Sequence, residues 1–119
     1  MRKSDFRDLQ IYHKSKALCT LLYKLTKSFP DDEKFGVISQ IRRAAISVSI
    51  NIAEGHGRSS NPDFIRFLYI SLGSVRELEA LLELSVELEF TTDCTEYLDR
   101  LQELAKMISS LIRTLKAEG

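Results

Sequence analysis

Apolar side chains recur at steps of three and four residues along nearly the whole chain, and this spacing limits its fold more than any other feature. The clearest run is Ile38, Ile41, Ala45, Val48 and Ile52, which lies on one face of an α-helix. The chain has only 5 Gly and 2 Pro, too few for the many tight turns of an all-β protein. The sequence therefore predicts an all-α fold.

Breaks in this periodicity divide the chain into four segments. Pro30 ends the first, the Gly-His-Gly turn at residues 55–57 ends the second, and the polar stretch after Phe90 ends the third. Asn61 is expected to cap the third helix, with Pro62 in its first turn. Four long helices with short connections predict a single domain over residues 1–119, folded as an up-down-up-down antiparallel four-helix bundle. The predicted helices cover about residues 8–28, 32–55, 61–89 and 95–117.

The charges cancel overall, with 17 Lys+Arg against 17 Asp+Glu, but they are unevenly distributed. Residues 1–28 carry seven basic and two acidic side chains (+5), whereas residues 61–90 carry two basic and six acidic ones (−4). Neutrality therefore does not exclude a nucleic-acid partner, although any binding is expected to be local and sensitive to salt. No apolar run approaches the length of a membrane helix, and no apolar leader follows the first residues. We therefore expect a cytoplasmic protein with no membrane partner.

The residue types that most often carry chemistry form no convincing site. Cys19 and Cys94 lack the close spacing of a zinc or redox motif, and His13 and His56 lack the Glu-x-x-His pattern of a di-iron bundle. We therefore expect no metal, no cofactor and no catalysis. One alternative is open, because Arg7 and His13 resemble the Arg-x(4–6)-His pattern of the HEPN ribonucleases. In that family the pair activates a ribose 2′-hydroxyl and stabilises charge on the phosphate.

The second predicted helix carries an unusual polar stripe opposite its apolar one. Long Lys and Glu side chains are typical of a solvated face, but the middle of this stripe is small or uncharged. Such a face favours burial against a neighbouring subunit, although a central position within its own bundle would also explain it. In the third helix Ser71, Gly73 and Ser74 likewise predict a close helix crossing. The stripe consists of Gln40, Arg43, Ser47, Asn51, Glu54 and Arg58.

Three runs of sequence resemble one known family. They are residues 40–45 (QIRRAA), 51–55 (NIAEG) and 73–78 (GSVREL). All three are similar to the four-helix bundle proteins named for the 23S rRNA intervening sequence, also called S23. The resemblance implies a bacterial protein whose bundles assemble into a ring, as a homopentamer. It also implies a relation to the accessory variability proteins of diversity-generating retroelements, which bind nucleic acid and a reverse transcriptase.

From these features we expect a non-enzymatic, ring-shaped homo-oligomer that binds the RNA or DNA backbone as an adaptor, with a protein such as a reverse transcriptase as a further partner. A scaffold that binds protein but not nucleic acid is the alternative. For Arg42 and Arg43 the alternative role is an ion pair between subunits, with Glu54 or the Glu77/Glu79 cluster. The candidate interface residues are Gln40, Ser47, Asn51, Glu54 and Glu77. The candidate nucleic-acid contacts are Arg42, Arg43, Arg58, Lys14, Lys16 and Arg7.

Overall fold

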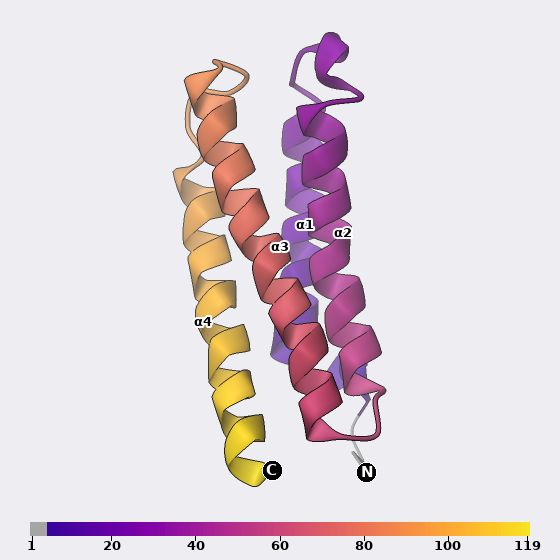
Figure 1. Ribbon diagram of the computed structural model, residues 1–119. Helices are drawn as coiled ribbons and strands as arrows, with labels where there is room; N and C mark the ends of the chain where they lie inside the picture. Colours follow the sequence, from indigo (N-terminus) through magenta and orange to yellow (C-terminus); the bar gives the residue numbers. More distant parts are fainter. Residues whose placement is uncertain (1–4) are drawn as a thin grey trace.

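Four long α-helices run side by side in the computed structural model, which describes residues 5–119 (Figure 1). Successive helices run in opposite directions, and the described residues contain no strand. The described body measures 46 × 20 × 19 Å. The prediction of an all-α four-helix bundle is therefore confirmed. The helices are α1 (Gln10–Thr26), α2 (Val37–His56), α3 (Asn61–Glu87) and α4 (Thr95–Glu118), with 3₁₀ turns η1 (Phe6–Asp8) and η2 (Asp31–Glu33).

The first two helices begin later than the sequence predicted, because a 3₁₀ turn precedes each of them. Asp5 caps η1, where its Oδ1 accepts a hydrogen bond from the Arg7 amide at 2.9 Å. Leu9 is then extended before α1 begins. η2 follows Pro30, and Gly36 (φ −110°, ψ −112°) comes between η2 and α2. The predicted starts at about residues 8 and 32 therefore fall within η1 and η2, two and five residues before the long helices begin.

Both ends of α3 have identifiable caps. Ser60, rather than the predicted Asn61, is the N-cap, and its hydroxyl accepts from the amide three residues later at 3.3 Å. At the other end Glu89 adopts a left-handed conformation (φ 65°). The Phe90 amide then donates to the Ser85 carbonyl at 2.8 Å. This closure is of the Schellman type, in which the left-handed position usually holds Gly.

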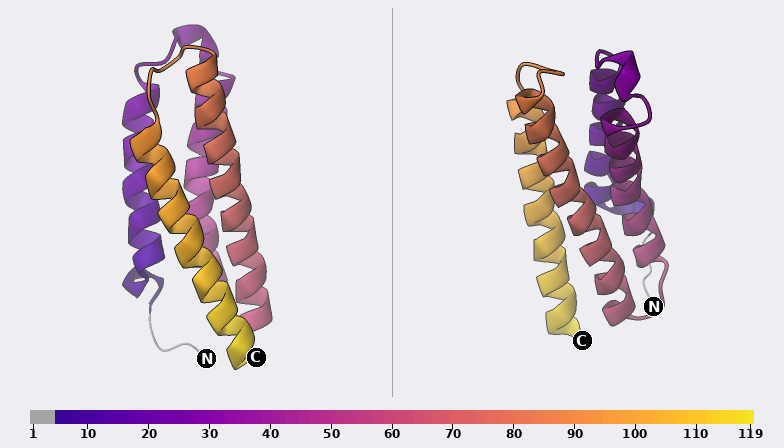
Figure 2. Two further views of the ribbon diagram at one scale, coloured as in Figure 1. Left: turned by 90° about the vertical axis from the view of Figure 1, so that its left-hand side faces the viewer. Right: turned by 45° about the horizontal axis from the view of Figure 1, so that its top comes forward.

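The hydrophobic core lies between all four helices. Each helix packs against two neighbours, in the order α1, α2, α3, α4 and back to α1, and Figure 2 shows this arrangement from two further directions. The α1–α2 edge therefore lies opposite the α3–α4 edge. Side chains buried at the centre include Leu22, Ile41, Ile52, Leu68, Leu82, Leu101 and Ile108.

A glycine lets α2 and α3 approach closely. A Cβ added to Gly55 would lie 2.7 Å from Phe67 Cβ and 2.9 Å from Phe64 Cδ1. The two helices therefore leave no room for a side chain at this point, which explains the glycine of the NIAEG run. Gly73 differs, because a Cβ added there would meet nothing within 4 Å. The predicted role of Gly73 in a close crossing was wrong.

Buried hydroxyl groups also join the helices. As predicted, Ser71 and Ser74 lie at the crossing with α2. No buried side-chain nitrogen or oxygen in the described part of the chain lacks a hydrogen-bond partner, so these polar groups are tolerated inside the bundle. The bonds run from Ser71 Oγ to the Val48 carbonyl (2.9 Å), from Ser74 Oγ to Ser47 Oγ (3.0 Å) and from Ser49 Oγ to Ser15 Oγ (3.0 Å).

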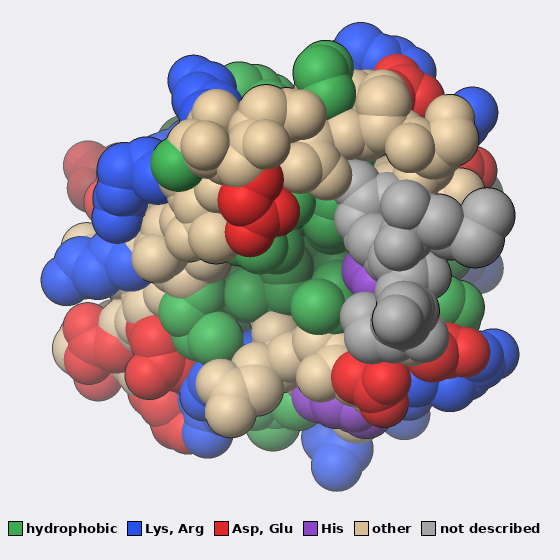
Figure 3. Space-filling view, turned by 90° about the horizontal axis from the view of Figure 1, so that it is seen from below, with side chains coloured by type: hydrophobic (Ala, Val, Ile, Leu, Met, Phe, Trp, Pro, Cys, Tyr) green, Lys and Arg blue, Asp and Glu red, His purple; other side chains and the backbone are tan. Residues whose placement is uncertain are grey.

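Charged side chains lie mostly around the outside of the bundle. Seen from the end that holds the α2–α3 turn, hydrophobic side chains show in the middle and Lys, Arg, Asp and Glu side chains lie toward the edge (Figure 3). Within residues 5–119 no helix combines the length and the apolar character needed to cross a bilayer.

Candidate functional site

Arg42 lies in the signature segment (residues 40–55) but contacts α1. Its Nε donates to Thr26 Oγ1 at 3.0 Å, and its Nη2 donates to the Tyr23 carbonyl at 3.2 Å. The guanidinium carbon lies 4.6 Å from the centroid of the Tyr23 ring, within the range of cation–π attraction. Arg42 therefore ties α2 to α1 within one chain and uses two of its five N–H donors to do so.

The ends of the polar stripe on α2 face solvent. Gln40, Arg43 and Glu54 are exposed, as is Glu77 on α3. Arg43 and Glu77 form no ion pair with any residue in the range 5–119, whereas Glu54 Oε2 lies 3.9 Å from Arg58 Nη2. Among the candidates, Arg43 and Glu77 thus keep their charge available for a partner.

The middle of the stripe is used within the chain. Asn51 Nδ2 donates to the carbonyl and hydroxyl of Ser47 at 2.9 and 3.0 Å, and Ser47 Oγ also accepts from Ser74 on α3. The hydrogen bonds at the α2–α3 crossing therefore explain why Ser47 and Asn51 are small and uncharged. The sequence offered two interpretations of the small, uncharged middle of the stripe, a subunit interface and a central position in the chain's own bundle. For Ser47 and Asn51 the second interpretation is sufficient.

The other four cationic candidates are dispersed over η1, α1 and the α2–α3 turn. Each already lies beside an acidic or aromatic side chain, and the two grooves described below hold at most one of the four. The contacts are Arg7 Nη1 with Asp5 Oδ2 (3.1 Å), Lys14 Nζ with Glu103 Oε1 (3.1 Å), Arg58 Nε with Asp63 Oδ2 (3.7 Å) and Lys16 Nζ above the Tyr12 ring (5.2 Å).

Arg7 and His13 are close together but are not arranged as a nuclease pair. His13 Nε2 meets the backbone carbonyl of Arg7, and because a carbonyl only accepts, this nitrogen carries the proton. The Arg7 guanidinium turns instead to Asp5. A general base and a phosphate-binding cation aimed at one substrate are therefore not assembled here.

The structure offers no metal centre among the residues it describes. No group of three or more His, Cys, Asp or Glu side chains comes together in that part of the chain. Cys19 and Cys94 are both free. Burial raises the pKa of each thiol, and the charge of Asp93 raises that of Cys94 further. Thiolate chemistry is disfavoured at both positions, and nothing in residues 5–119 points to catalysis.

A shallow apolar groove of about 590 Å³ runs between α1 and α2. Ile46 and Ile50 lie in it with 44% and 52% of their surface exposed. Single exposed apolar residues are common, but a grouped set along one groove is typical of an interaction site. This α1–α2 groove is lined by Tyr12, Lys16, Cys19, Thr20, Tyr23, Ile46, Ser49 and Ile50.

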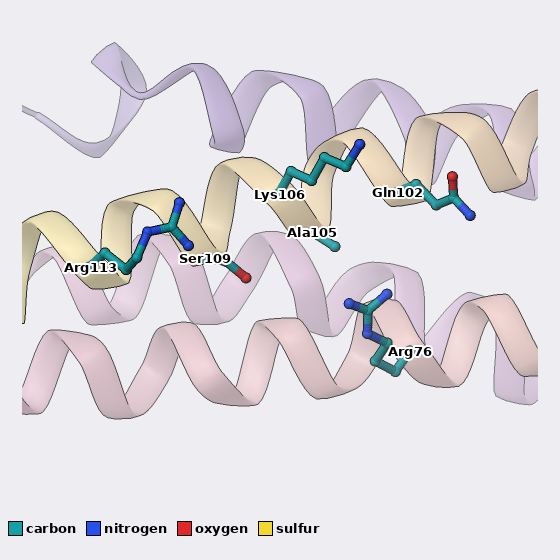
Figure 4. A pocket seen from close by; sticks show the side chains of 6 residues that line it. All are labelled: Arg76, Gln102, Ala105, Lys106, Ser109 and Arg113. Atoms are coloured by element: carbon teal, nitrogen blue, oxygen red, sulfur yellow. The ribbon is translucent and has the colours of Figure 1, made fainter.

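A second hollow, of about 460 Å³, lies on the opposite edge between α3 and α4. Figure 4 shows Arg76 reaching from α3 toward α4, where Ala105 and Ser109 point into the space between the helices. Lys106 and Arg113 form no ion pair with any residue that the structure describes. This α3–α4 groove is lined by Arg76, Gln102, Ala105, Lys106, Ser109 and Arg113.

The α3–α4 groove was missed in the sequence because charge was summed over whole segments. Residues 61–90 total −4, which hides Arg76. A spacing signal was nevertheless present, since Gln102, Lys106, Ser109 and Arg113 follow one another at steps of four, three and four. That spacing places an uninterrupted polar and basic stripe on one face of α4.

Two comparisons match the chain over most of its length. The sequence model of the family described as 23S rRNA-intervening sequence protein matches residues 7–110. Among solved structures, the chain is similar to a protein with unknown function from the S23 ribosomal protein family of Bacteroides thetaiotaomicron VPI-5482, with 28% sequence identity and a TM-score of 0.77. That match covers 86% of this chain and 97% of the other. No curated protein matches the chain at a significant level.

Proposed function

Because the chain belongs to the family of 23S rRNA-intervening sequence proteins, as its QIRRAA, NIAEG and GSVREL runs predicted, we propose that it is a non-enzymatic homo-oligomer that associates with nucleic acid. In this proposal five bundles form a ring in a bacterial cytoplasm. The ring presents basic side chains to the RNA or DNA backbone and acts as an adaptor, with a protein such as a reverse transcriptase as a further partner.

The observation that carries the proposal is the α1–α2 groove. Ile46 and Ile50 together leave about half of their surface in water. Burying apolar surface is worth roughly 25 cal/mol per Å², so a second copy seated on this groove would gain stability. Self-association thus accounts for a feature that a lone bundle does not need.

Repetition of subunits supports the nucleic-acid part of the proposal. Arg43 is exposed and lies three and seven residues from Ile46 and Ile50, on the same outer side of α2. In a ring each subunit contributes its own Arg43, so one exposed positive charge per chain becomes a repeated set of positive charges. The partner surface for Arg43 is either a phosphate or the exposed Glu77 of a neighbouring subunit.

A protein-binding scaffold without affinity for nucleic acid is the second candidate. It is favoured by one observation, namely that five of the six proposed cations already have partners within the chain. Arg42 is held by Tyr23 and Thr26, Lys16 lies above the Tyr12 ring, and the other three lie beside carboxylates. The three cations paired with carboxylates release fewer counterions on binding, and therefore contribute less to affinity for a phosphate backbone.

Light scattering at several protein concentrations tests the assembly. We expect an oligomer for the wild type and monomers for Ile46→Glu, because the substitution puts a charge into the proposed interface. Leu84→Glu is the matched control, since Leu84 lies on α3 away from the groove and is 46% exposed against 44% for Ile46. A wild-type chain that stays monomeric at every concentration refutes self-association.

Fluorescence anisotropy with labelled RNA and DNA separates the two candidates. The adaptor predicts binding that weakens steeply with added salt, because phosphate contacts release counterions. If the folded and assembled protein binds neither RNA nor DNA at low ionic strength, the adaptor is refuted and the protein-binding scaffold is left as the function.

A further inference from the structure

We infer that the α3–α4 groove binds the sugar–phosphate backbone of a single-stranded nucleic acid. This inference rests on the proposed function and names the surface that performs it. The sequence signature pointed to α2 instead, at Arg42 and Arg43. The structure ties Arg42 to α1, whereas it gathers cations from two helices at the α3–α4 groove.

The balance of charge at the groove is positive. Three cations line it, and the single carboxylate paired with any of them is that of Glu79, which lies 2.7 Å from Arg76 Nη1. Three positive charges and one negative charge leave a net +2. Lys106 and Arg113 supply this excess, since neither has an acidic partner among the described residues. Such cations keep the counterion release that drives phosphate binding.

The shape of the groove suits a chain better than a small molecule. Gln102 and Arg113 are eleven residues apart on α4, which corresponds to about 16 Å along the helix axis. Ser109 lies between them and offers a hydroxyl, and Gln102 itself offers an amide. Both are neutral donors that commonly bond phosphate oxygens. Ala105 is the only apolar residue of the lining, so the groove has no pocket for an acyl chain or an apolar side chain.

One end of the groove adds an aromatic platform. Lys116 continues the α4 stripe three residues beyond Arg113, and its Nζ donates to the Tyr69 hydroxyl at 2.9 Å. Tyr69 is 48% exposed, and the Lys116 ammonium lies 5.4 Å from the centroid of its ring. An exposed ring beside a row of cations is the arrangement on which bases of single strands stack, whatever their sequence. The bases of a duplex are already stacked on one another, so this platform favours a single strand.

The position of the groove is compatible with self-association. The α3–α4 edge lies opposite the α1–α2 edge, because each helix packs only against its two neighbours in the described bundle. Figure 1 shows these two pairs of helices on different sides of the molecule. A subunit whose α1–α2 groove is covered by another copy therefore still presents the α3–α4 groove to a ligand.

The test compares two double variants that remove the same charge. Lys106→Gln/Arg113→Gln removes the two groove cations that have no acidic partner, and Lys24→Gln/Lys27→Gln removes two exposed cations at the C-terminal end of α1. All four side chains are exposed and outside the core, and circular dichroism and light scattering confirm that each variant folds and assembles. The probe is a labelled single-stranded RNA, followed by anisotropy over a series of salt concentrations.

We expect the groove variant to lose affinity and salt dependence together. With a slope of about −0.7 per phosphate contact on single strands, losing two contacts flattens the plot of log K against log salt by about 1.4. If the two proteins bind equally at about 1 M salt, this difference in slope makes the groove variant bind roughly 60-fold more weakly at about 50 mM salt. The α1 variant should stay within a few-fold of wild type. Equal losses in the two variants, or an unchanged groove variant, overturn the inference.

A third variant tests the aromatic platform. Tyr69→Leu keeps an apolar side chain but removes the ring, so single-strand affinity should fall at least about fivefold while the salt slope changes little. Binding of a duplex of the same sequence should not respond to Tyr69→Leu. An equal response of both probes overturns the assignment to single strands.

The outcomes also distinguish this inference from the proposed function. Wild-type protein that binds no RNA refutes both. Wild-type protein that binds RNA, together with a groove variant that binds as tightly, refutes only the α3–α4 groove. In that case Arg43→Gln is the next variant, because Arg43 is the exposed cation of the signature segment.

Discussion

Replacing Gly55 with Ala offers a direct test of how α2 and α3 fit together. The added Cβ would lie 2.7 Å from Phe67 Cβ, against about 3.5–4.0 Å for ordinary contact between carbon atoms. Phe67 Cβ is attached to the backbone of α3 and cannot turn aside, so the helices themselves must separate. Overpacking of this kind costs about 1–3 kcal/mol, and the immobile neighbour places Gly55 at the upper end of that range.

A helix-propensity gain of up to about 1 kcal/mol opposes this cost, because Ala is a better helix former than Gly. The expected net loss for Gly55→Ala is therefore about 2 kcal/mol. Gly73→Ala is the matched control, since Gly73 lies in the interior of α3 with nothing within 4 Å of the added Cβ. It keeps the gain without the clash, and should be stabilised by about 1 kcal/mol.

Thermal unfolding followed by far-UV circular dichroism measures both effects. For a domain of this size 1 kcal/mol corresponds to a shift in Tm of about 4 °C. We expect Gly55→Ala to lower Tm by about 8 °C and Gly73→Ala to raise it by about 4 °C. The variants are compared at one protein concentration, because association makes Tm depend on concentration. If Gly55→Ala raised Tm as Gly73→Ala does, the close approach of α2 and α3 would be wrong.

Substitutions at three further positions have defined expectations. Arg42→Ala should lower the free energy of unfolding by about 1–2 kcal/mol in urea titrations. Arg42→Lys should recover less than half of this loss, because lysine lacks the planar guanidinium group. No loss in Arg42→Ala would show that the contacts of Arg42 with α1 do not form. Glu89→Gly should raise the free energy of unfolding by about 1 kcal/mol, since Glu89 has φ 65°. Glu89→Asn should have a stability between those of wild type and Glu89→Gly. Destabilisation by Gly would contradict the left-handed cap. The hydroxyl and amide of Thr95 donate to Asp93 and hold the pKa of that carboxyl below its ordinary value. The ionised Asp93 therefore stabilises the fold above about pH 5, and this stabilisation is lost as pH falls through the lowered pKa. Asp93→Asn should therefore lose less unfolding free energy than wild type between about pH 6 and about pH 3, and an equal loss would argue against the bond.

The helices could be predicted because their signals are local. Apolar spacing at steps of three and four residues, together with Pro30 and the 55–57 turn, is enough to place four segments. The starts of α1 and α2 were missed because η1 and η2 are single turns whose capping competes with the longer helix. A single turn has no apolar periodicity by which it could be recognised.

The roles of individual side chains could not be predicted, because their partners lie far away in the sequence. Arg42 finds its hydrogen-bond partners 16 and 19 residues earlier, at Thr26 and Tyr23. Its neighbour Arg43 differs only in its position around the helix, and yet it faces solvent. Likewise, Arg76 lines one groove with Lys106 and Arg113 only once α3 and α4 have packed. A count of charges by segment therefore does not show which cations the fold brings together.

The hydroxyl pairs between helices specify a single alignment of the bundle. Ser15 meets Ser49, and Ser47 meets Ser74, at 3.0 Å in each case. Sliding one helix by a turn, about 5.4 Å, would separate each pair and take from the Ser49 and Ser74 hydroxyls the acceptors they use here, at about 0.5–1.5 kcal/mol for each bond lost. Apolar side chains alone tolerate such a slip better, because hydrophobic groups of similar volume can replace one another. The two hydroxyl contacts thus add to the apolar core in determining which turn of one helix faces which turn of the next.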